Sequence, residues 1–369
     1  MQLMQDELFF RIALTMVPHI GCIQGRILIE HFGDARSVFS ASLYKLMSTE
    51  GIGEFRASAI KQFSNFKDVE KEIKFIVEHD VRPIFITEPE YPKKLLHCPD
   101  APLLLFFKST TSFPAERMIG IVGTRHNTAY GRHVTETLVK ELYPFNVTIV
   151  SGLAYGIDAI AHKCALASNM KTIAVMAHGL DMIYPPEHAK LAREITMQGG
   201  LLTEFTTGTD PDRHNFPSRN RIVAGLCDAT VVIETGVKGG SMITADLANG
   251  YNRDVFAIPG RIDDDKSIGC NELIRTNKAV LFTSVKHMVE LLGWNDEKKI
   301  LKKQQKEIFH DLSEEEKRIL SILSTSEFVH IDEICFKSNF STSQVAAALL
   351  NLEIHNLVHS IPGKLYSLE

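Results

Sequence analysis

Between residues 118 and 282, short apolar runs alternate with longer stretches of helical periodicity. The apolar runs have the length of buried strands and lie at residues 118–122, 147–150, 172–176, 201–205, 229–233, 255–258 and 279–282. The segments between them, such as 131–142 and 157–167, repeat their apolar positions every three or four residues. Buried strands joined by helices imply right-handed crossovers, so the pattern predicts an α/β fold with a doubly wound parallel sheet.

The first 80 residues show a different, purely helical pattern. Apolar residues recur at helical spacing in residues 8–16, 23–32, 41–47 and 55–66. Turns at residues 18–21 and 50–53 end in glycine before a helical stretch and resemble those of a helix-hairpin-helix, where backbone N–H groups approach a phosphate. Glycine at a helix–helix turn also has purely structural uses. Both interpretations stay open, and we favour packing within a small helical domain, SAM- or helix-hairpin-helix-like, over residues 1–80.

Two further segments complete the predicted organisation. Residues 81–117 contain six prolines and are expected to form an extended connector within a domain that spans 81–295. Residues 296–310 include the basic stretch 298–306, with five lysines, and are expected to be a linker or an exposed helix. In residues 311–369, a capping box of Ser313 and Glu316 opens a helix at 314–323. Helices at 330–338 and 342–356 and a hairpin centred on Pro362-Gly363 then predict a winged helix.

Composition narrows the class of protein. At 369 residues, the chain is expected to hold two or three domains. The six cysteines stand far apart without a CxxC pair, which excludes the common zinc patterns and indicates reduced thiols in a cytoplasm. The apolar runs are too short for a membrane span, and the N-terminus lacks the basic region of a secretory signal. A net charge of −5 excludes a uniformly basic coat but not a local nucleic-acid groove.

The first two strand-to-helix junctions carry candidate phosphate-binding chemistry. Gly123, Thr124 and Arg125 follow the first strand, where a glycine turn presents N–H groups and the arginine offers a planar fork. Ser151 and Gly152 follow the second strand. Asp158 and His162, four residues apart on the next helix, form either a catalytic dyad or a lock between loop and sheet, and we favour the lock. No P-loop, GxGxxG or GxSxG motif is present, so neither triphosphate hydrolysis nor a hydrolase triad has support.

Three later clusters extend this chemistry. Phe216 stands beside two arginines, a combination that single-stranded nucleic acid binders use, although by pattern alone it is more often a core residue. This third cluster comprises Phe216, Arg219, Asn220 and Arg221. The fourth cluster is a glycine-rich turn with Lys238, Gly239, Gly240 and Ser241. The fifth is Pro259-Gly260-Arg261, after the next strand.

All five clusters are expected at the carboxyl ends of strands, and in a parallel sheet they would converge on one edge. Five cations would then meet backbone amides and hydroxyls on one rim: Arg125, Arg219, Arg221, Lys238 and Arg261. Several phosphate-binding turns in a row suit a chain of phosphates better than a single mononucleotide. The convergence is a stronger signal than any one motif.

Five sequence blocks together resemble the DNA-processing protein A (DprA/Smf) family. They are GTRHNTAYG (123–131), SGLAYGIDAIAH (151–162), FPSRNRIVAGL (216–226), ETGVKGGSMITA (234–245) and PGRIDDDKSIGCNELI (259–274). The resemblance implies an extended Rossmann fold, binding of single-stranded DNA, dimerisation through the Rossmann domain and loading of the recombinase RecA during natural transformation. It also implies that Gly123, Thr124 and Arg125 grip phosphate and that Phe216 stacks on a base. Thr124 stands where many members of the family have serine, and it keeps the hydroxyl. Cys227 also stands where serine is frequent, and we interpret this difference as a change in packing.

A second function class stays in competition with DNA binding. The same variety of Rossmann fold resembles nucleoside-phosphate-processing enzymes of the lysine-decarboxylase-like group, which carry a PGGxGT turn with a catalytic acid nearby. Here the turn at 238–244 has neither PGG nor an acid, and Glu234 is the nearest carboxylate. We therefore predict a DNA-binding recombination mediator without catalytic residues, metal or cofactor.

The predicted winged helix is acidic, which is not typical of a domain that binds DNA. Residues 311–369 contain four basic and nine acidic residues, a net charge of −5, whereas the first 310 residues balance at 36 of each sign. The candidate recognition helix at 342–356 has no lysine or arginine. Because phosphate contacts dominate affinity for DNA, we predict a protein-interaction module that contacts a partner or the basic stretch 298–306.

Overall fold

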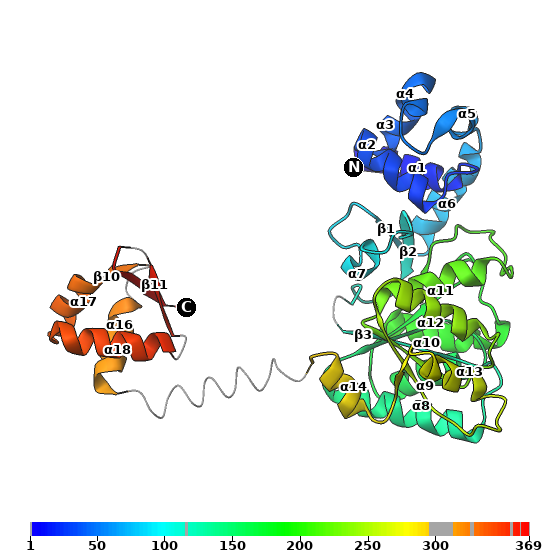
Figure 1. The fold of residues 1–369 in the computed structure, drawn as a ribbon. Coiled ribbons are helices and arrows are strands. Elements are labelled where there is room, and N and C mark those ends of the chain that lie inside the picture. The colour runs from blue at the N-terminus through cyan, green and yellow to red at the C-terminus, as the bar shows by residue number, and fades with distance from the viewer. Residues whose placement is uncertain are drawn as a thin grey trace. The chain divides into compact units, whose positions relative to one another are not determined.

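The computed structural model describes residues 2–114, 117–294, 313–324, 328–354, 357–361 and 363–368. The chain divides into two compact units, Met1–Leu292 and Gly293–Glu369 (Figure 1). In the described parts of the chain, no helix has both the length and the apolar character needed to cross a membrane.

A mixed sheet forms the centre of the first unit (Figure 1). Its nine described strands are β1 (Val81–Phe85), β2 (Leu104–Lys108), β3 (Met118–Gly123), β4 (Thr148–Ser151), β5 (Thr172–Val175), β6 (Gly200–Thr203), β7 (Ala229–Ile233), β8 (Asp254–Ala257) and β9 (Val280–Leu281). Their order is β1-β2-β6-β5-β4-β3-β7-β8-β9, and β3 to β9 run parallel. All seven predicted strands are confirmed, each to within two residues, and so is the predicted doubly wound α/β class.

The proline-rich segment extends the sheet, which the expectation of a connector missed. β1 pairs antiparallel with β2, and β2 pairs antiparallel with β6. The apolar side chains of both strands are buried, as in the run from Leu104 to Phe107 of β2, whereas Arg82 of β1 is exposed. Pro83 is tolerated inside β1 because this strand forms the edge of the sheet, where a missing N–H breaks no ladder.

Helices cover both faces of the sheet. α8 (Ala129–Leu142), α9 (Ile157–Ala167) and α10 (Ala189–Gln198) pack side by side, and α11 (Asn215–Leu226) packs along α12 (Gly240–Gly250) on the other face (Figure 1). The remaining helices of this part are α7 (Lys93–Leu96), α13 (Ile268–Arg275) and α14 (Val285–Leu291). α9 has the predicted bounds, and α8 begins two residues before its predicted start.

The N-terminal segment folds into helices that share a core with the sheet. They are α1 (Gln2–Met16), α2 (Cys22–Phe32), α3 (Ala35–Ser40), α4 (Leu43–Met47), α5 (Gly53–Gln62) and α6 (Phe66–Glu78). The sequence analysis assigned no helix to α3 or α6. One apolar core runs from Ile12 and Leu28 to Phe85 and Leu103, so this segment and the sheet form a single compact unit. The boundary at residue 80 and the DNA contact of the glycine turns both stay predictions.

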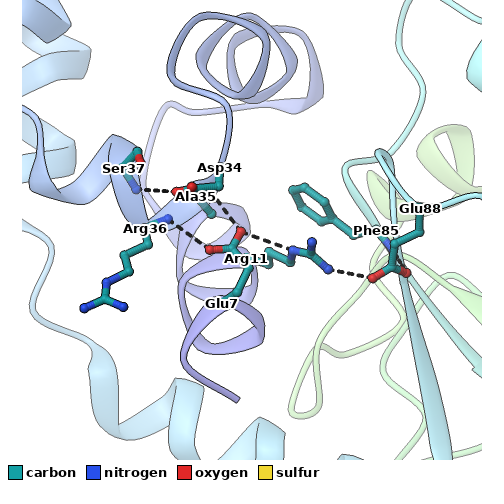
Figure 2. A network of polar contacts seen from close by, with 8 residues as sticks. All are labelled: Glu7, Arg11, Asp34, Ala35, Arg36, Ser37, Phe85 and Glu88. Atoms are coloured by element: carbon teal, nitrogen blue, oxygen red, sulfur yellow. Dashed lines mark hydrogen bonds and ion pairs between the residues drawn. The ribbon is translucent and has the colours of Figure 1, made fainter. Parts of the chain in front are cut away.

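A polar network ties α1 to the edge of the sheet (Figure 2). Arg11 donates to Glu88 at 2.6 Å and to Glu7 at 3.2 Å, and its guanidinium lies 4.6 Å from the centre of the Phe85 ring. Glu7 also accepts from the backbone N–H of Ala35, at the start of α3. A charge with this many partners is half-buried at little cost, so Arg11 fixes α1 and α3 to β1.

The second unit has the predicted winged-helix fold. Its elements are α16 (Glu314–Leu323), β10 (Val329–His330), α17 (Ile331–Ser338), α18 (Thr342–Ile354), β11 (Val358–Ile361) and β12 (Leu365–Leu368). The capping box of Ser313 and Glu316 is confirmed, with both reciprocal hydrogen bonds. β12 lies between β10 and β11 in a small antiparallel sheet. The basic stretch 298–306 and Pro362 lie outside the described residues.

Candidate nucleic-acid interface

A groove of about 930 Å³ lies at the carboxyl edge of the parallel strands. Ten of the fourteen predicted site residues line it: Gly123, Thr124, Arg125, Gly152, Phe216, Arg219, Asn220, Gly239, Gly240 and Ser241. The turns after β3, β4 and β7 supply three sides, and the first turns of α11 supply the fourth. The structure therefore brings four of the five clusters together.

The other four predicted residues do not line the groove. Ser151 is fully buried, and its hydroxyl donates to the Ile121 carbonyl at 2.6 Å. Arg221 forms an ion pair with Glu204, and most of its side chain is buried. Lys238 is exposed in the turn before α12. Arg261 is 84% exposed and pairs with Asp263 at 3.2 Å.

The turn after β3 is fixed by the backbone at the end of β7. The N–H of Thr124 donates to the Glu234 carbonyl at 2.7 Å, which fixes this turn against the end of β7. A Cβ on Gly123 would lie 2.0 Å from the Ile233 carbonyl oxygen, so only glycine fits there. Arg125 is exposed beyond this fixed turn.

His162 and Asp158 lie buried below the turn after β4. His162 hydrogen-bonds to the Gly152 carbonyl at 2.6 Å through Nε2 and to Thr172 Oγ1 at 2.7 Å through Nδ1. Burial lowers the pKa of His162 to about 4. Asp158 instead accepts from the Ala154 N–H, so the two side chains have different partners and not the hydrogen bond to each other that was expected. The interpretation of His162 as a lock between loop and sheet is confirmed.

Arg219 forms the floor of the groove instead of its rim. Only 6% of this residue is exposed, and it donates to the Val175 carbonyl at 2.8 Å. A Cβ on Gly152 would lie 2.0 Å from its Nη1 and 2.5 Å from the Asp158 carboxylate, so glycine leaves room for this pair. Burial raises the pKa of Asp158, and the positive charge of Arg219 opposes that rise.

Phe216 stands at the junction of two cavities. Its half-buried ring lies 5.4 Å from the Arg125 guanidinium and 5.7 Å from that of Arg219. One cavity is the groove, and the other is an aromatic pocket of about 430 Å³. Phe216 lies on the first turn of α11, eleven residues beyond the predicted end of its strand, because residues 204–214 form a loop after β6. The predicted placement of this cluster at a strand end is wrong.

The aromatic pocket contains residues that the sequence analysis missed, namely Tyr155, His178, Tyr184 and Pro185. His178 is buried just after β5, at the same edge of the sheet. The residues that follow β5 include no arginine or lysine, so the pattern of positive charge did not predict a site there. Its position after a predicted strand was the available signal.

The turn before α12 is open toward the groove. Ser241 donates to the Thr235 hydroxyl at 2.7 Å, and the N–H of Gly239 donates to the Gly236 carbonyl at 2.9 Å. No side chain caps α12 at Gly239, and no atom lies within 4 Å of the position of a Cβ on Gly240. Helix N-termini that are open in this way accept anions.

Glu234 is fully engaged by the protein. Its carboxylate accepts from the backbone N–H groups of Thr128 and Gly131, at 2.8 and 3.2 Å, and from the Thr128 hydroxyl. A catalytic acid needs a free oxygen that faces the substrate, and this carboxylate faces the start of α8. Within the described residues, no three His, Cys, Asp or Glu side chains gather as a metal site.

Two family models match this chain. The model of the DNA recombination-mediator protein A matches residues 82–293, and that of the DprA winged helix domain matches residues 308–364. The protein Smf of Synechocystis sp. is 33% identical over 98% of both chains.

Two solved structures are similar as well. The X-ray structure of DNA processing protein A from Streptococcus pneumoniae is 32% identical, with a TM-score of 0.68 over 76% of this chain and 97% of that one. The DNA processing protein A of Helicobacter pylori, described for its single-stranded DNA binding mode, is also 32% identical. Its TM-score is 0.51 over 57% of this chain and 95% of that one.

Proposed function

This chain belongs to the DNA recombination-mediator protein A (DprA/Smf) family, and from that premise we propose that it binds single-stranded DNA in the groove above Arg219. The single observation that supports this most is the convergence of three glycine-containing turns on one groove, the one before α12 being open, together with an exposed arginine and a half-buried aromatic ring. Backbone N–H groups and Arg125 suit a row of phosphates, and a ring at the end of the groove suits a base.

We further propose the finer role that the family implies. Bound single strands are protected and passed to RecA recombinase during natural transformation, by a homodimer that associates through its Rossmann domain in the cytoplasm. The Helicobacter pylori relative, described for its single-stranded DNA binding mode, supports the DNA ligand. RecA loading rests on the family alone.

We propose no catalytic role for the groove. The nucleoside-phosphate-processing alternative needs a carboxylate free to act on a glycosidic bond. Glu234 is the candidate for that role, but both of its carboxylate oxygens accept hydrogen bonds from the start of α8. Asp158 is buried beside Arg219. An assay of glycosidic hydrolysis with nucleoside monophosphates tests this directly, and robust turnover would overturn the proposal.

Titration of the full chain with labelled oligonucleotides at two salt concentrations tests the DNA site. We expect tighter binding to single-stranded than to double-stranded DNA. Arg125→Ala should weaken binding and flatten the salt dependence by about 0.7 in log–log slope, the contribution of one phosphate contact. Phe216→Ala should cost roughly 1–3 kcal/mol with an unchanged slope, because stacking releases no counterion.

Arg193, which is exposed on α10 and does not line the groove, offers the matched control. Arg193→Ala removes the same charge and should leave both affinity and slope close to wild type. If Arg125→Ala and Phe216→Ala also bind as the wild type does, the DNA site lies elsewhere.

A further inference from the structure

The loop between β6 and α11 leads directly into the groove. Residues 204–214 form this loop, and α11 begins right after it with Asn215 and Phe216. Arg219 and Asn220, one turn further along the same helix, line the groove together with Phe216. The conformation of the loop therefore determines where the first turn of α11 and its aromatic ring lie.

A polar cavity lies between this loop and the N-terminal helices. It has a volume of about 1300 Å³ and is lined by Thr15 and Met16 of α1, by Asp68 and Glu72 of α6 and by residues 204–209 of the loop. Since this space separates the loop from much of α1 and α6, apolar packing holds the loop against these helices only in part. Hydrogen bonds across the cavity are needed to fix it.

Glu72 supplies such hydrogen bonds near the middle of the loop. Its carboxylate accepts from the backbone N–H of Thr207 at 2.8 Å and from the Thr207 hydroxyl at 2.6 Å. On its other side, the loop is tied to the residues that follow β5. Asp181 accepts from the Gly208 N–H at 3.1 Å, and the Thr209 carbonyl accepts from the Gly179 N–H at 3.1 Å. The loop is thus held between α6 and the loop after β5.

Glu72 is buried at a cost in desolvation. Only 3% of it is exposed, and within the described residues no cation pairs with it. Lys71, its neighbour on α6, pairs with Asp68 at 2.6 Å instead. Burial raises the pKa of Glu72, and the two hydrogen bonds from Thr207 oppose that rise. A buried carboxylate is stabilised here almost entirely by the loop that it holds.

We propose that Glu72 is a positioning residue through which the N-terminal helices fix the loop before α11 and so hold Phe216 in the groove. This inference rests on the proposed function, because it assigns a support to the same DNA site. It gives the N-terminal helices a role in DNA binding that needs no contact between them and the strand.

The first test is a titration of the full chain with a labelled single-stranded oligonucleotide. Glu72→Ala should weaken binding about threefold to tenfold. The salt dependence should stay unchanged, because Glu72 does not line the groove. Loss of a negative charge alone would tighten binding, so the direction of the change separates positioning from electrostatics. Glu72→Gln keeps an acceptor of the same size and should bind within about twofold of the wild type.

The matched control breaks a different polar contact of the N-terminal helices. Arg11 joins α1 to Glu88, beside β1 rather than beside the loop (Figure 2). Arg11→Ala should lower the Tm and still bind the oligonucleotide within about twofold of the wild type. Equal losses of affinity in Arg11→Ala and Glu72→Ala would overturn the proposal.

A double-mutant cycle shows whether Glu72 acts through Phe216. In a Phe216→Ala chain, Glu72→Ala should weaken binding by less than about twofold, because its effect needs the ring. A merely structural loss would lower the affinity by the same factor in both backgrounds. Additive effects of the two substitutions would therefore overturn the proposal.

Amide hydrogen exchange provides a readout that involves no DNA. Residues 204–216 should exchange at least about threefold faster in Glu72→Ala than in the wild type or in Arg11→Ala. Thr207→Val removes the hydroxyl donor from the other side of the same contact, so it should also speed exchange if Glu72→Ala does not fold. Unchanged exchange in the folded variants would overturn the proposal. A wild-type chain that binds no oligonucleotide would defeat the proposed function separately.

Discussion

Buried charge gives the groove its shape at the level of single residues. Arg219 and Asp158 lie under the Gly152 turn, and the Arg219 guanidinium is held by the Val175 carbonyl. A charge in such a place needs partners, because its desolvation costs several kcal/mol. Arg219 and Asp158 therefore form a fixed floor of the groove, while the charge of Arg125 is exposed at the surface.

Arg221, which was expected to contact DNA, lies in a buried ion pair, and we expect its role to be structural. Its guanidinium forms an ion pair with Glu204, and burial raises the pKa of that carboxyl while Arg221 opposes the rise. Arg221→Ala should lower the free energy of unfolding by about 3–5 kcal/mol, because it leaves Glu204 buried and unpaired. Urea unfolding measures this loss.

An exposed pair serves as the control for Arg221. Arg275, 72% exposed, pairs with Glu272, and Arg275→Ala should cost less than about 1 kcal/mol. The folded fraction of Arg221→Ala should bind single-stranded DNA within a few-fold of wild type. Loss of DNA affinity without loss of stability would contradict this assignment.

The His162 lock predicts a dependence of stability on pH. Burial holds the pKa of His162 at about 4, below its ordinary value of 6.5, so the folded chain keeps the ring neutral. Between these values the unfolded chain binds a proton that the folded chain does not. The contribution of His162 is thus complete above pH 6.5 and is lost as the pH falls toward 4, by up to about 3 kcal/mol.

Comparison with His162→Gln isolates the contribution of His162 to the pH dependence of stability. The comparison is needed because burial raises the pKa of acids such as Glu72 and Glu204, and these acids change stability with pH in the opposite direction. Urea unfolding at several pH values between 7.5 and 4.5, roughly the titration range of histidine, should show a shallower loss for the variant. Parallel pH profiles would show that the folded and unfolded chains protonate His162 over the same pH range, which would contradict the prediction.

At the level of elements, the sequence predicts what periodicity controls. The parallel strands are apolar runs, buried except for the edge strand β9, so all seven were predicted, and α9 was predicted with its bounds. β1 and β2 were missed because the segment that contains them has six prolines and because β2 pairs with β6, about a hundred residues away along the chain. The site was found as a set of turns, but the roles of Arg219, Arg221 and Ser151 depend on tertiary partners that no local pattern contains.

Gly156 and Gly240 differ in their expected roles: the first is needed for the fold, and the second leaves space for a ligand. Gly156 has a φ of 78°, and a Cβ there would lie 2.2 Å from the Thr124 carbonyl oxygen, whereas Gly240 faces open space. Gly156→Ala should lower stability by at least about 2 kcal/mol. Gly240→Ala should leave stability within about 0.5 kcal/mol and weaken single-stranded DNA binding about tenfold, because its methyl group stands where a phosphate would approach the N–H groups.

Thermal unfolding and oligonucleotide titration of both variants separate the two effects. Gly156→Ala should lose more stability than Gly240→Ala, and this order is a firmer prediction than the size of either loss. If Gly240→Ala binds DNA as tightly as the wild type, the start of α12 does not contact phosphate.

At the level of the whole molecule, the helical segment and the sheet share one core, so Met1–Leu292 is the smallest part that we would isolate. We expect this part to dimerise. β9 ends the sheet as an open edge, with Val280 39% and Leu281 43% exposed, which supports an association through the sheet domain. Sedimentation of residues 1–292 should show a dimer, and a strict monomer at concentrations on the order of 10 µM would count against this placement.

The acidic winged helix carries the last prediction. The net charge of residues 311–369 is −5, and α18, the candidate recognition helix, holds Glu353 and no lysine or arginine. Apolar side chains are exposed instead, with Phe336 on α17 at 87% and Leu350 on α18 at 57%. Such a surface has almost nothing with which to hold phosphates, and it suits a protein partner.

We therefore expect residues 311–369 not to bind duplex DNA. Their deletion should leave single-stranded DNA affinity within a few-fold of the full chain, because the groove lies entirely within the first unit. The measurement is a titration of both chains with single- and double-stranded oligonucleotides at physiological salt, with circular dichroism as the control for folding. Removing five net negative charges should, if anything, tighten binding slightly, since these charges repel the strand. A hundredfold loss of affinity in a folded truncation would assign a DNA contact to the winged helix that its charge does not predict.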